Sequence, residues 1–129
     1  MIRFLFIYGT LHPRLAPPCV AGAVRMLRPA GRGTSRGVLY DLGEYPGAKF
    51  DTASESIIHG RVYRLPRSIA TAAAVLHDLD AYESVDAGLF VRQPIRVMLR
   101  NGRRLICWAY QYNRPCDGAA IVVGGRYAR

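Results

Sequence analysis

Residues 90–112 read FVRQPIRVMLRNGRRLICWAYQY, in which two β-prone runs, 90–99 and 105–112, flank the sequence Arg100-Asn101-Gly102-Arg103. Asn-Gly between two such runs is the strongest short-range signal of a β-hairpin. A two-residue turn would leave one face apolar and the opposite face, with Arg92, Arg96 and Arg100, in solvent. The cross-strand pairs that this register predicts are Val91 with Tyr112, Gln93 with Tyr110, Ile95 with Trp108 and Val97 with Ile106.

Further short strands are predicted before and after this hairpin. Residues 2–8 form an apolar run that ends at Gly9, and residues 57–65 alternate between apolar and polar side chains. A strand at 38–42 follows the glycine-rich stretch 31–37 and ends in a turn at 43–47. Residues 121–123 suit a last strand or a segment that covers an edge of the sheet. Because no βαβ periodicity is present, we predict an α+β fold in one domain over residues 1–129: a small mixed β-barrel with flanking helices.

Residues 66–83 carry the clearest helical pattern of the chain. Pro66 suits a first helical turn, and the helix is predicted from about residue 67 to residue 82 or 83. A weaker helix, with Gly22 inside it, is predicted within residues 18–27. The apolar stripe of the main helix is formed by Ile69, Ala72, Ala73, Leu76 and Leu79.

The next position on that stripe is Glu83, seven residues after Leu76. Burial of a carboxyl group raises its pKa toward neutrality, where the group can both accept and donate a proton. The alternative is that the helix frays before Tyr82 and Glu83 lies in solvent, and periodicity alone leaves both open. The nearby acids lie off the stripe and are expected on a solvated face: Asp78, Asp80 and Asp86.

The chain is strongly basic, with a net charge of +9 and 18 cationic residues, of which Lys49 is the only lysine. Such a charge attracts phosphates and acidic surfaces. The arginines are spread along the chain, however, and no aromatic residues alternate with them as in single-strand binders. A strong preference for Arg over Lys more often reflects the base composition of the genome than a binding patch, so a nucleic-acid partner is not expected.

Cysteines and histidines give no sign of a metal or a disulfide framework. Cys19, Cys107 and Cys116 have neither CxxC spacing nor an even count, which predicts reduced thiols. The three histidines are not spaced as metal ligands. No cofactor is therefore expected.

No apolar run approaches the roughly 20 residues of a membrane span, and residues 4–7 lack the features of a secretory signal. These patterns predict a soluble cytoplasmic protein without a membrane partner. We expect a monomer or a weak homodimer.

The sequence Tyr8-Gly9-Thr10-Leu11 follows the first predicted strand. Backbone N–H groups and a glycine at such a position permit close approach to a carboxylate or phosphate, although a purely structural turn has the same pattern. GxSxG, P-loop and GxGxxG motifs and a Cys-His pair are all absent.

Several short motifs occur in a characteristic order: Tyr8-Gly9-Thr10-Leu11, Leu39-Tyr40-Asp41-Leu42-Gly43-x-Tyr45-Pro46-Gly47, Gly60-x-Val62-Tyr63, Leu79-Asp80-x-Tyr82-Glu83-Ser84, Phe90-x-Arg92, Trp108-Ala109-Tyr110-x-Tyr112 and Ile121-x-x-Gly124-x-x-Tyr127. The series resembles the γ-glutamylcyclotransferase-like family, including the γ-glutamylamine cyclotransferases and AIG2-like proteins. The resemblance covers nearly the whole chain.

The resemblance implies a small barrel with a cavity for a γ-glutamyl substrate. It implies that Tyr8, Gly9, Thr10 and Leu11 bind the substrate through backbone groups, and that Glu83 is the acid–base residue. Tyr110 and Tyr112, on the predicted apolar face of the hairpin, are candidate cavity hydroxyls. The chain departs from the family pattern in having His12-Pro13-Arg14 after the loop and Ser84 in place of a glycine.

The function implied is a cofactor-independent cyclotransferase that converts a γ-glutamyl amine or γ-glutamyl-modified compound to 5-oxoproline and free amine. The α-amino group of the substrate would attack its own γ-carbonyl group, with Glu83 transferring the proton. Two alternatives stay open: a non-catalytic member that binds a small anionic metabolite in the same cavity, and an Arg-rich nucleic-acid accessory protein. The leaving amine is not identified by the sequence.

Overall fold

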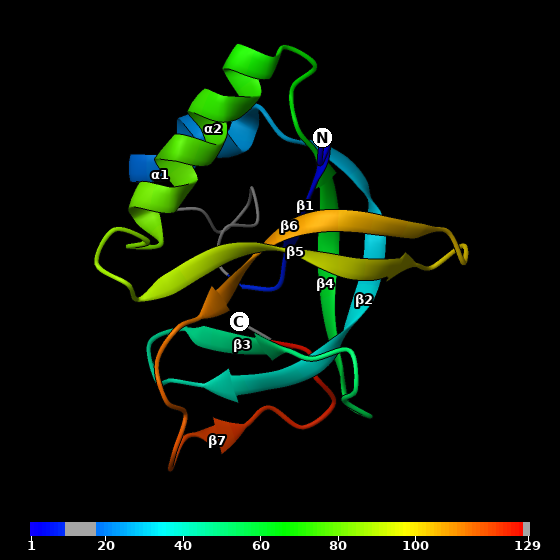
Figure 1. The fold of residues 1–129 in the computed structure, drawn as a ribbon, viewed down its shortest axis with the longest axis vertical. Coiled ribbons are helices and arrows are strands. Elements are labelled where there is room, and N and C mark those ends of the chain that lie inside the picture. The colour runs from blue at the N-terminus through cyan, green and yellow to red at the C-terminus, as the bar shows by residue number, and fades with distance from the viewer. Residues whose placement is uncertain (10–17, 128–129) are drawn as a thin grey trace.

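A computed structural model of the chain describes residues 1–9 and 18–127. Nine elements follow one another along this part of the chain (Figure 1): β1 (Phe4–Ile7), α1 (Pro18–Arg25), β2 (Arg28–Asp41), β3 (Pro46–Phe50), β4 (Ile57–Arg64), α2 (Ile69–Tyr82), β5 (Phe90–Leu99), β6 (Arg104–Tyr112) and β7 (Ala120–Ile121).

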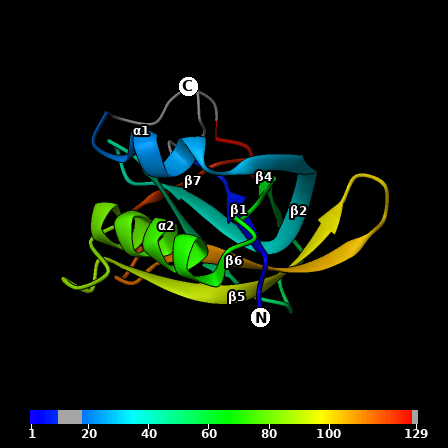
Figure 2. The same cartoon turned by 90° about the horizontal axis from the view of Figure 1, so that it is seen from above.

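Five strands close into a barrel. The sheet order is β3-β2-β4-β1-β6-β5, and the additional pairing of β2 with β5 joins the two sides into a ring of β2, β4, β1, β6 and β5. The β1–β6 pairing is parallel and the other pairings are antiparallel, while β3 and β7 both pair with the far end of β2. Figure 2 shows α1 and α2 next to each other on one side of the barrel. The predicted α+β fold, a mixed barrel with flanking helices, is confirmed.

Two apolar clusters stabilise this arrangement. One fills the barrel and includes Phe6, Ile58, Val62 and Cys107. The other lies between the barrel and the helices and joins Val24 of α1 and Leu79 of α2 to strand residues that include Leu5 and Tyr110. Tyr110 therefore faces the helices rather than the barrel interior.

The second strand is much longer than predicted, because the glycine-rich stretch at 31–37 is part of β2. A Cβ at Gly33 would lie 2.7 Å from Val97 Cγ1 and 2.9 Å from the Met98 carbonyl oxygen. Glycine is required here because β5 crosses β2 closely where the barrel closes, with Gly33 opposite Leu99. Strand β3, at the end of the predicted turn, was not predicted.

The hairpin forms as predicted, but its predicted register is wrong by one residue. The Leu99 N–H donates to the Arg103 carbonyl group at 2.8 Å, and Gly102 has φ +86°, so the turn has three residues with glycine in the left-handed position. The observed pairs include Phe90 with Tyr112, Arg92 with Tyr110, Pro94 with Trp108, Ile95 with Cys107 and Val97 with Leu105.

This one-residue slip changes which side chains share a face. Arg92 lies on the same face as Tyr110, beneath the helices, and the prediction that it sits in solvent is wrong. Arg96 and Arg100 are exposed, as predicted.

The main helix begins at Ile69 because the Ser68 hydroxyl caps it, accepting the Thr71 N–H at 3.3 Å. Its buried residues are Ala72, Val75 and Leu79. The predicted stripe is wrong at Ile69, which is 64% exposed, and at Ala73, which is also exposed, and it missed the buried Val75. The weaker helix is confirmed as α1.

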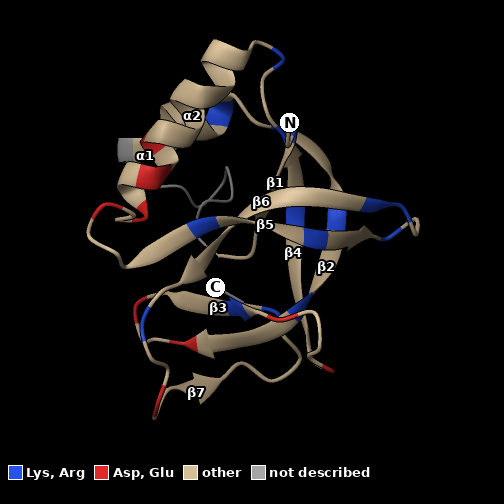
Figure 3. Ribbon diagram, in the orientation of Figure 1, with Lys and Arg blue, Asp and Glu red and all other residues tan. Residues whose placement is uncertain are grey.

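Charge is segregated over the surface. Figure 3 shows cationic positions side by side on β2, β4, β5 and β6 near the hairpin turn, and acidic positions at the end of α2 and in loops. Arg32 of β2 lies directly opposite Arg61 of β4, and both are exposed. Cys107 and Cys116 are free thiols. Over the described ranges, no helix combines the length and apolar character needed to cross a membrane.

The contact between β1 and β4 at Gly60 gives a first prediction. A Cβ there would lie 2.6 Å from Phe6 Cζ and 2.7 Å from the Ile7 carbonyl oxygen, and the backbone oxygen cannot rotate away. Gly60→Ala should therefore lower the free energy of unfolding, measured with urea, by about 1–3 kcal/mol. The control is Gly22→Ala in α1, where the new Cβ meets nothing within 4 Å. That change should stabilise by about 0.5–1 kcal/mol, and equal effects of the two substitutions would contradict the packing described here.

Candidate active site

A pocket of about 270 Å³ lies where the end of β1, the turn before β3, the end of α2 and the hairpin meet. Most of its lining is apolar or aromatic. The described lining residues are Phe6, Ile7, Tyr8, Gly9, Tyr45, Pro46, Tyr82, Glu83, Ser84, Leu89, Phe90 and Tyr110.

Glu83 reaches this pocket because it is the C-cap of α2. The helix ends in a Schellman motif, in which the Ser84 N–H donates to Ala81 O at 3.2 Å and the Val85 N–H to Asp80 O at 3.1 Å. Ser84 takes the left-handed φ of +55° that this motif requires. The position therefore suits glycine, which is the residue the family pattern has there. The helix does not fray before Tyr82, so that alternative is wrong.

Burial raises the pKa of Glu83 from its ordinary 4.5 to about 7. Within the described lining it is the one charged side chain. Burial also raises the pKa of Tyr8 and of Tyr110, and the charge of Glu83 raises both further. All three side chains line the same pocket, and the Glu83 carboxyl group changes charge in the range where proton transfer at neutral pH is efficient.

The hydroxyl group of Tyr8 is held by backbone groups on two other strands. It donates to the Tyr110 carbonyl oxygen at 2.5 Å and accepts the Ala48 N–H at 3.3 Å. These bonds fix the end of β1, and with it Gly9, against β6 and β3. Gly9 is also close to the next turn, since a Cβ there would lie 3.0 Å from Pro46 Cγ.

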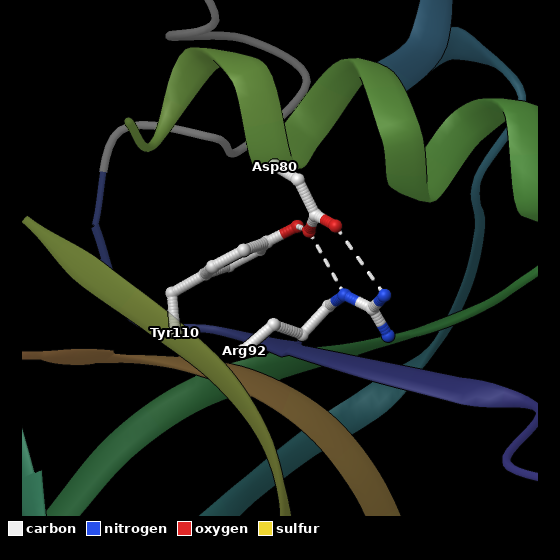
Figure 4. Close-up of polar contacts among 3 residues, drawn as sticks. All are labelled: Asp80, Arg92 and Tyr110. Atoms are coloured by element: carbon white, nitrogen blue, oxygen red, sulfur yellow. Dashed lines mark hydrogen bonds and ion pairs between the residues drawn. The ribbon is translucent and has the colours of Figure 1, made fainter. Parts of the chain in front are cut away.

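An ion pair and a hydrogen bond attach the last turn of α2 to the hairpin (Figure 4). Arg92 donates to Asp80 from Nε at 2.8 Å and from Nη2 at 3.3 Å, and the Tyr110 hydroxyl donates to Asp80 Oδ1 at 2.6 Å. The Arg92 guanidinium also lies 4.3 Å from the centre of the Trp108 ring. The prediction that Asp80 is solvated is wrong, because α2 covers the face of the hairpin that carries Arg92 and Tyr110.

The structure brings some of the predicted site residues together in one pocket. Tyr8, Gly9 and Glu83 line one pocket, whereas Thr10 and Leu11 lie outside the described residues. Tyr112 is not part of the described lining. Its ring packs 5.4 Å from the ring of Phe90, behind the pocket wall.

The remaining lining residues were not predicted as site residues: Phe6, Ile7, Tyr45, Pro46, Tyr82, Ser84, Leu89 and Phe90. Of these, Tyr45 and Phe90 belong to motifs that carry the family resemblance, and those motifs could have identified them as site residues. Leu89 has no such signal. Over residues 1–9 and 18–127, no three His, Cys, Asp or Glu side chains are grouped so that they could hold a metal ion.

Comparison with known proteins identifies the family. Residues 5–129 match the family described as "Gamma-glutamyl cyclotransferase, AIG2-like", and the chain belongs to this family. It is 34% identical over 87 residues to the Escherichia coli K12 "Gamma-glutamylcyclotransferase family protein YtfP". That match covers 67% of this chain and 64% of the relative, so the chain spans less than two thirds of the relative's length in this comparison.

Solved structures show the same fold. An AIG2-like protein from Mus musculus superposes with a TM-score of 0.75 at 18% identity, over 98% of this chain and 88% of that protein. The solution structure of Escherichia coli YtfP superposes with a TM-score of 0.66 at 29% identity, over 96% of this chain and 95% of that protein. YkqA from Bacillus subtilis superposes with a TM-score of 0.71 at 21% identity, over 98% of this chain but only 40% of that protein.

The left-handed conformation at Ser84 gives a second prediction. Ser84→Gly removes a steric cost of about 1 kcal/mol, so it should raise the free energy of unfolding by about that amount and the melting temperature by a few degrees. The reciprocal change, Gly88→Ser, puts a side chain on a glycine with φ +76° and nothing within 4 Å. It should destabilise the protein comparably, and a stabilising effect of Gly88→Ser would count against the argument.

The raised pKa of Glu83 gives a third prediction. An acid whose pKa is higher in the folded than in the unfolded state stabilises the fold below its unfolded pKa, and this contribution is lost as pH rises through the folded pKa. Relative to Glu83→Gln, the wild-type protein should therefore lose stability between pH 4.5 and about 7, by up to about 3 kcal/mol. Urea unfolding at a series of pH values measures this. Parallel curves for wild type and Glu83→Gln would show that the carboxyl group is not buried, and the exposed Asp86→Asn variant is the control.

Proposed function

We propose that the protein is a cofactor-independent cyclotransferase that converts a γ-glutamyl amine or other γ-glutamyl-modified compound to 5-oxoproline and the free amine. The observation that supports this most strongly is Glu83: a carboxyl group with a pKa of about 7, in a pocket of small-molecule size, in a member of the γ-glutamyl cyclotransferase family.

The proposed reaction needs no nucleophile from the protein. The substrate's α-amino nitrogen forms a bond to its own γ-carbonyl carbon, and the bond from that carbon to the leaving nitrogen breaks. The α-ammonium group loses two protons as the lactam forms. One is carried to the leaving nitrogen, which departs as the free amine, and the other is released to solvent, so atoms and charge balance without a co-reactant. Because both reacting groups belong to one molecule, the site has to select the folded conformer of the substrate and transfer the proton.

Glu83 is suited to both parts of that proton transfer. As a carboxylate it accepts the proton from the α-ammonium group, and as a carboxylic acid it returns the proton to the leaving nitrogen. A pKa of about 7 lets each form exist near neutral pH. Its place in the Schellman motif at the end of α2 fixes the backbone from which the side chain extends.

The loop after β1 is proposed to bind the glutamyl part of the substrate. Gly9 lines the pocket and follows Tyr8, whose hydroxyl bonds fix the end of the strand. Backbone N–H groups of Gly9, Thr10 and Leu11 would hold the α-carboxylate or the developing oxyanion. For Thr10 and Leu11 this role rests on the family resemblance.

The experiment is release of 5-oxoproline from a panel of γ-glutamyl compounds. Glu83→Gln keeps the shape of the side chain and removes the base, so it should lower kcat/KM by about 10²–10⁴-fold, while Asp86→Asn should leave it unchanged. In the wild-type protein, kcat/KM should fall as pH decreases through about 7, because protonation of Glu83 removes the base.

Turnover by Glu83→Gln at the wild-type rate would contradict the proposal. Binding of γ-glutamyl compounds by the wild-type protein without any product would favour the non-catalytic alternative instead. Circular dichroism of each variant separates loss of activity from loss of folding.

A further inference from the structure

The fold gathers on one outer face of the barrel arginines that are far apart in the sequence (Figure 3). We propose that this face binds the phosphate backbone of a single-stranded nucleic acid, at a site separate from the pocket that contains Glu83. The spacing of the arginines along the chain gives no sign of such a partner, because they become neighbours only when the barrel closes.

A groove of about 1080 Å³ opens on this face, where β2 and β5 separate. The two strands pair only at Gly33 with Leu99 and at Thr34 with Met98, and further along β2 pairs with β3 instead. Small-molecule pockets have volumes of about 300–1,000 Å³ and are mostly enclosed by apolar walls. A long groove of this volume, open to solvent between strands, suits a segment of an extended chain better than a small molecule.

Side-chain hydrogen bonds hold the strands around the groove in place. The almost fully buried Ser35 hydroxyl donates to the Arg96 carbonyl oxygen at 2.7 Å and joins β2 to β5 where their backbones no longer pair. Gln111 Oε1 accepts the Gln93 side-chain N–H and the Phe50 backbone N–H, each at 2.9 Å, and so joins β6 to both β5 and β3. A partner would therefore meet a preformed surface, which lowers the entropic cost of binding.

The lining of the groove is basic. Arg36, Arg96 and Arg104 line it, and Asp51 is the one acid of the described lining. All three arginines are exposed, and none of them forms an ion pair with another described residue. Arg36 donates from Nη1 to Ser54 O at 2.9 Å, which leaves its other N–H groups available. A guanidinium group without an acid partner can bind a phosphate through two parallel hydrogen bonds.

The positive surface continues beyond the groove. Arg32 lies on the same face of β2 as Arg36 and directly opposite Arg61 of β4. The Arg100 N–H donates to the Arg32 carbonyl oxygen at 3.0 Å, which brings the hairpin turn, with Arg103, to this pair. Like charges directly opposite each other destabilise a sheet. The Arg32–Arg61 pair therefore does not serve stability, and a bound polyanion would relieve its repulsion.

Apolar side chains lie among these arginines on the outer face of the hairpin. Arg96 lies opposite Ile106, and Met98 lies opposite Arg104. Ile106 is 49% exposed and Met98 is 45% exposed. Unpaired bases can lie against such side chains while their phosphates reach the arginines, whereas a duplex covers its bases and an acidic polypeptide offers only the charges. These observations favour a single strand.

A lipid surface fits this face less well. Binding in the membrane interface needs apolar groups that project from a basic face. Ile106 and Met98 lie within strands, and the more exposed Ile121 and Val123 lie on or next to β7, which pairs with the far end of β2. The apolar groups best placed for insertion are therefore away from the arginines.

The test is fluorescence anisotropy with a labelled oligothymidylate of about 12 nucleotides. The wild-type protein should bind it with a Kd of about 1–100 μM, and the logarithm of the binding constant should fall linearly with the logarithm of the salt concentration. The same measurement with a duplex of equal length, with poly-L-glutamate and with phosphatidylserine vesicles should give weaker binding in each case.

Two triple variants separate this face from the net charge of the protein. Replacing the three groove arginines with glutamine should weaken binding at least about tenfold and lower the salt slope by about 2. The control removes the same charge from exposed arginines outside the described lining and should change the Kd less than about threefold. If the groove variant does not fold, Arg104→Gln alone decides the proposal through a slope lower by about 0.7. The groove variant is Arg36→Gln, Arg96→Gln and Arg104→Gln, and the control is Arg25→Gln, Arg67→Gln and Arg114→Gln.

Each other outcome would overturn the proposal. Equal losses in the two triple variants would show that net charge alone attracts the strand, and absence of binding at low salt would show that the face has no such partner. Tighter binding of the duplex, of poly-L-glutamate or of the vesicles would assign the face to a different partner. Glu83→Gln should bind oligothymidylate as the wild-type protein does, because Glu83 lies outside the groove lining, so the result does not depend on the proposed cyclotransferase activity.

Discussion

The attachment of the end of α2 to the hairpin is the interaction on which the pocket depends. Asp80 accepts two bonds from Arg92 and one from the Tyr110 hydroxyl, and the two charged side chains are only 23% and 26% exposed. Removing either charge would leave its partner partly desolvated, which costs more than loss of a surface ion pair. Because Asp80 lies one helical turn before Glu83, the position of the pocket's acid follows from this contact.

Tyr110 connects both sides of the pocket through two different groups. Its hydroxyl binds Asp80 near the end of α2, and its carbonyl oxygen accepts the hydroxyl of Tyr8 at the end of β1. One residue of β6 therefore connects the end of α2, where Glu83 lies, to Tyr8 at the end of β1. Nearly complete burial of Tyr110, at 4% exposure, keeps water from competing for either bond.

The sequence predicts the elements better than the contacts between them. Glu83 could be identified because it lies seven residues after Leu76 on the predicted stripe and falls in a motif of the family, and the barrel followed from several strands without βαβ spacing. The hairpin register could not be identified, because Asn-Gly suits both a two-residue turn and a three-residue turn with glycine last. The type of turn decides which residues of β6 share a face with Arg92. Because the wrong turn was predicted, the Asp80–Arg92 pair was not predicted either. The role of the glycines in β2 depends on β5, more than 50 residues away in the chain, and no local pattern contains it.

The raised pKa of Glu83 follows from the walls of the pocket that it lines. Aromatic and aliphatic walls exclude water, which destabilises the carboxylate form of Glu83 and raises its pKa to about 7. A cation in the lining would lower that pKa and weaken Glu83 as a base near neutral pH.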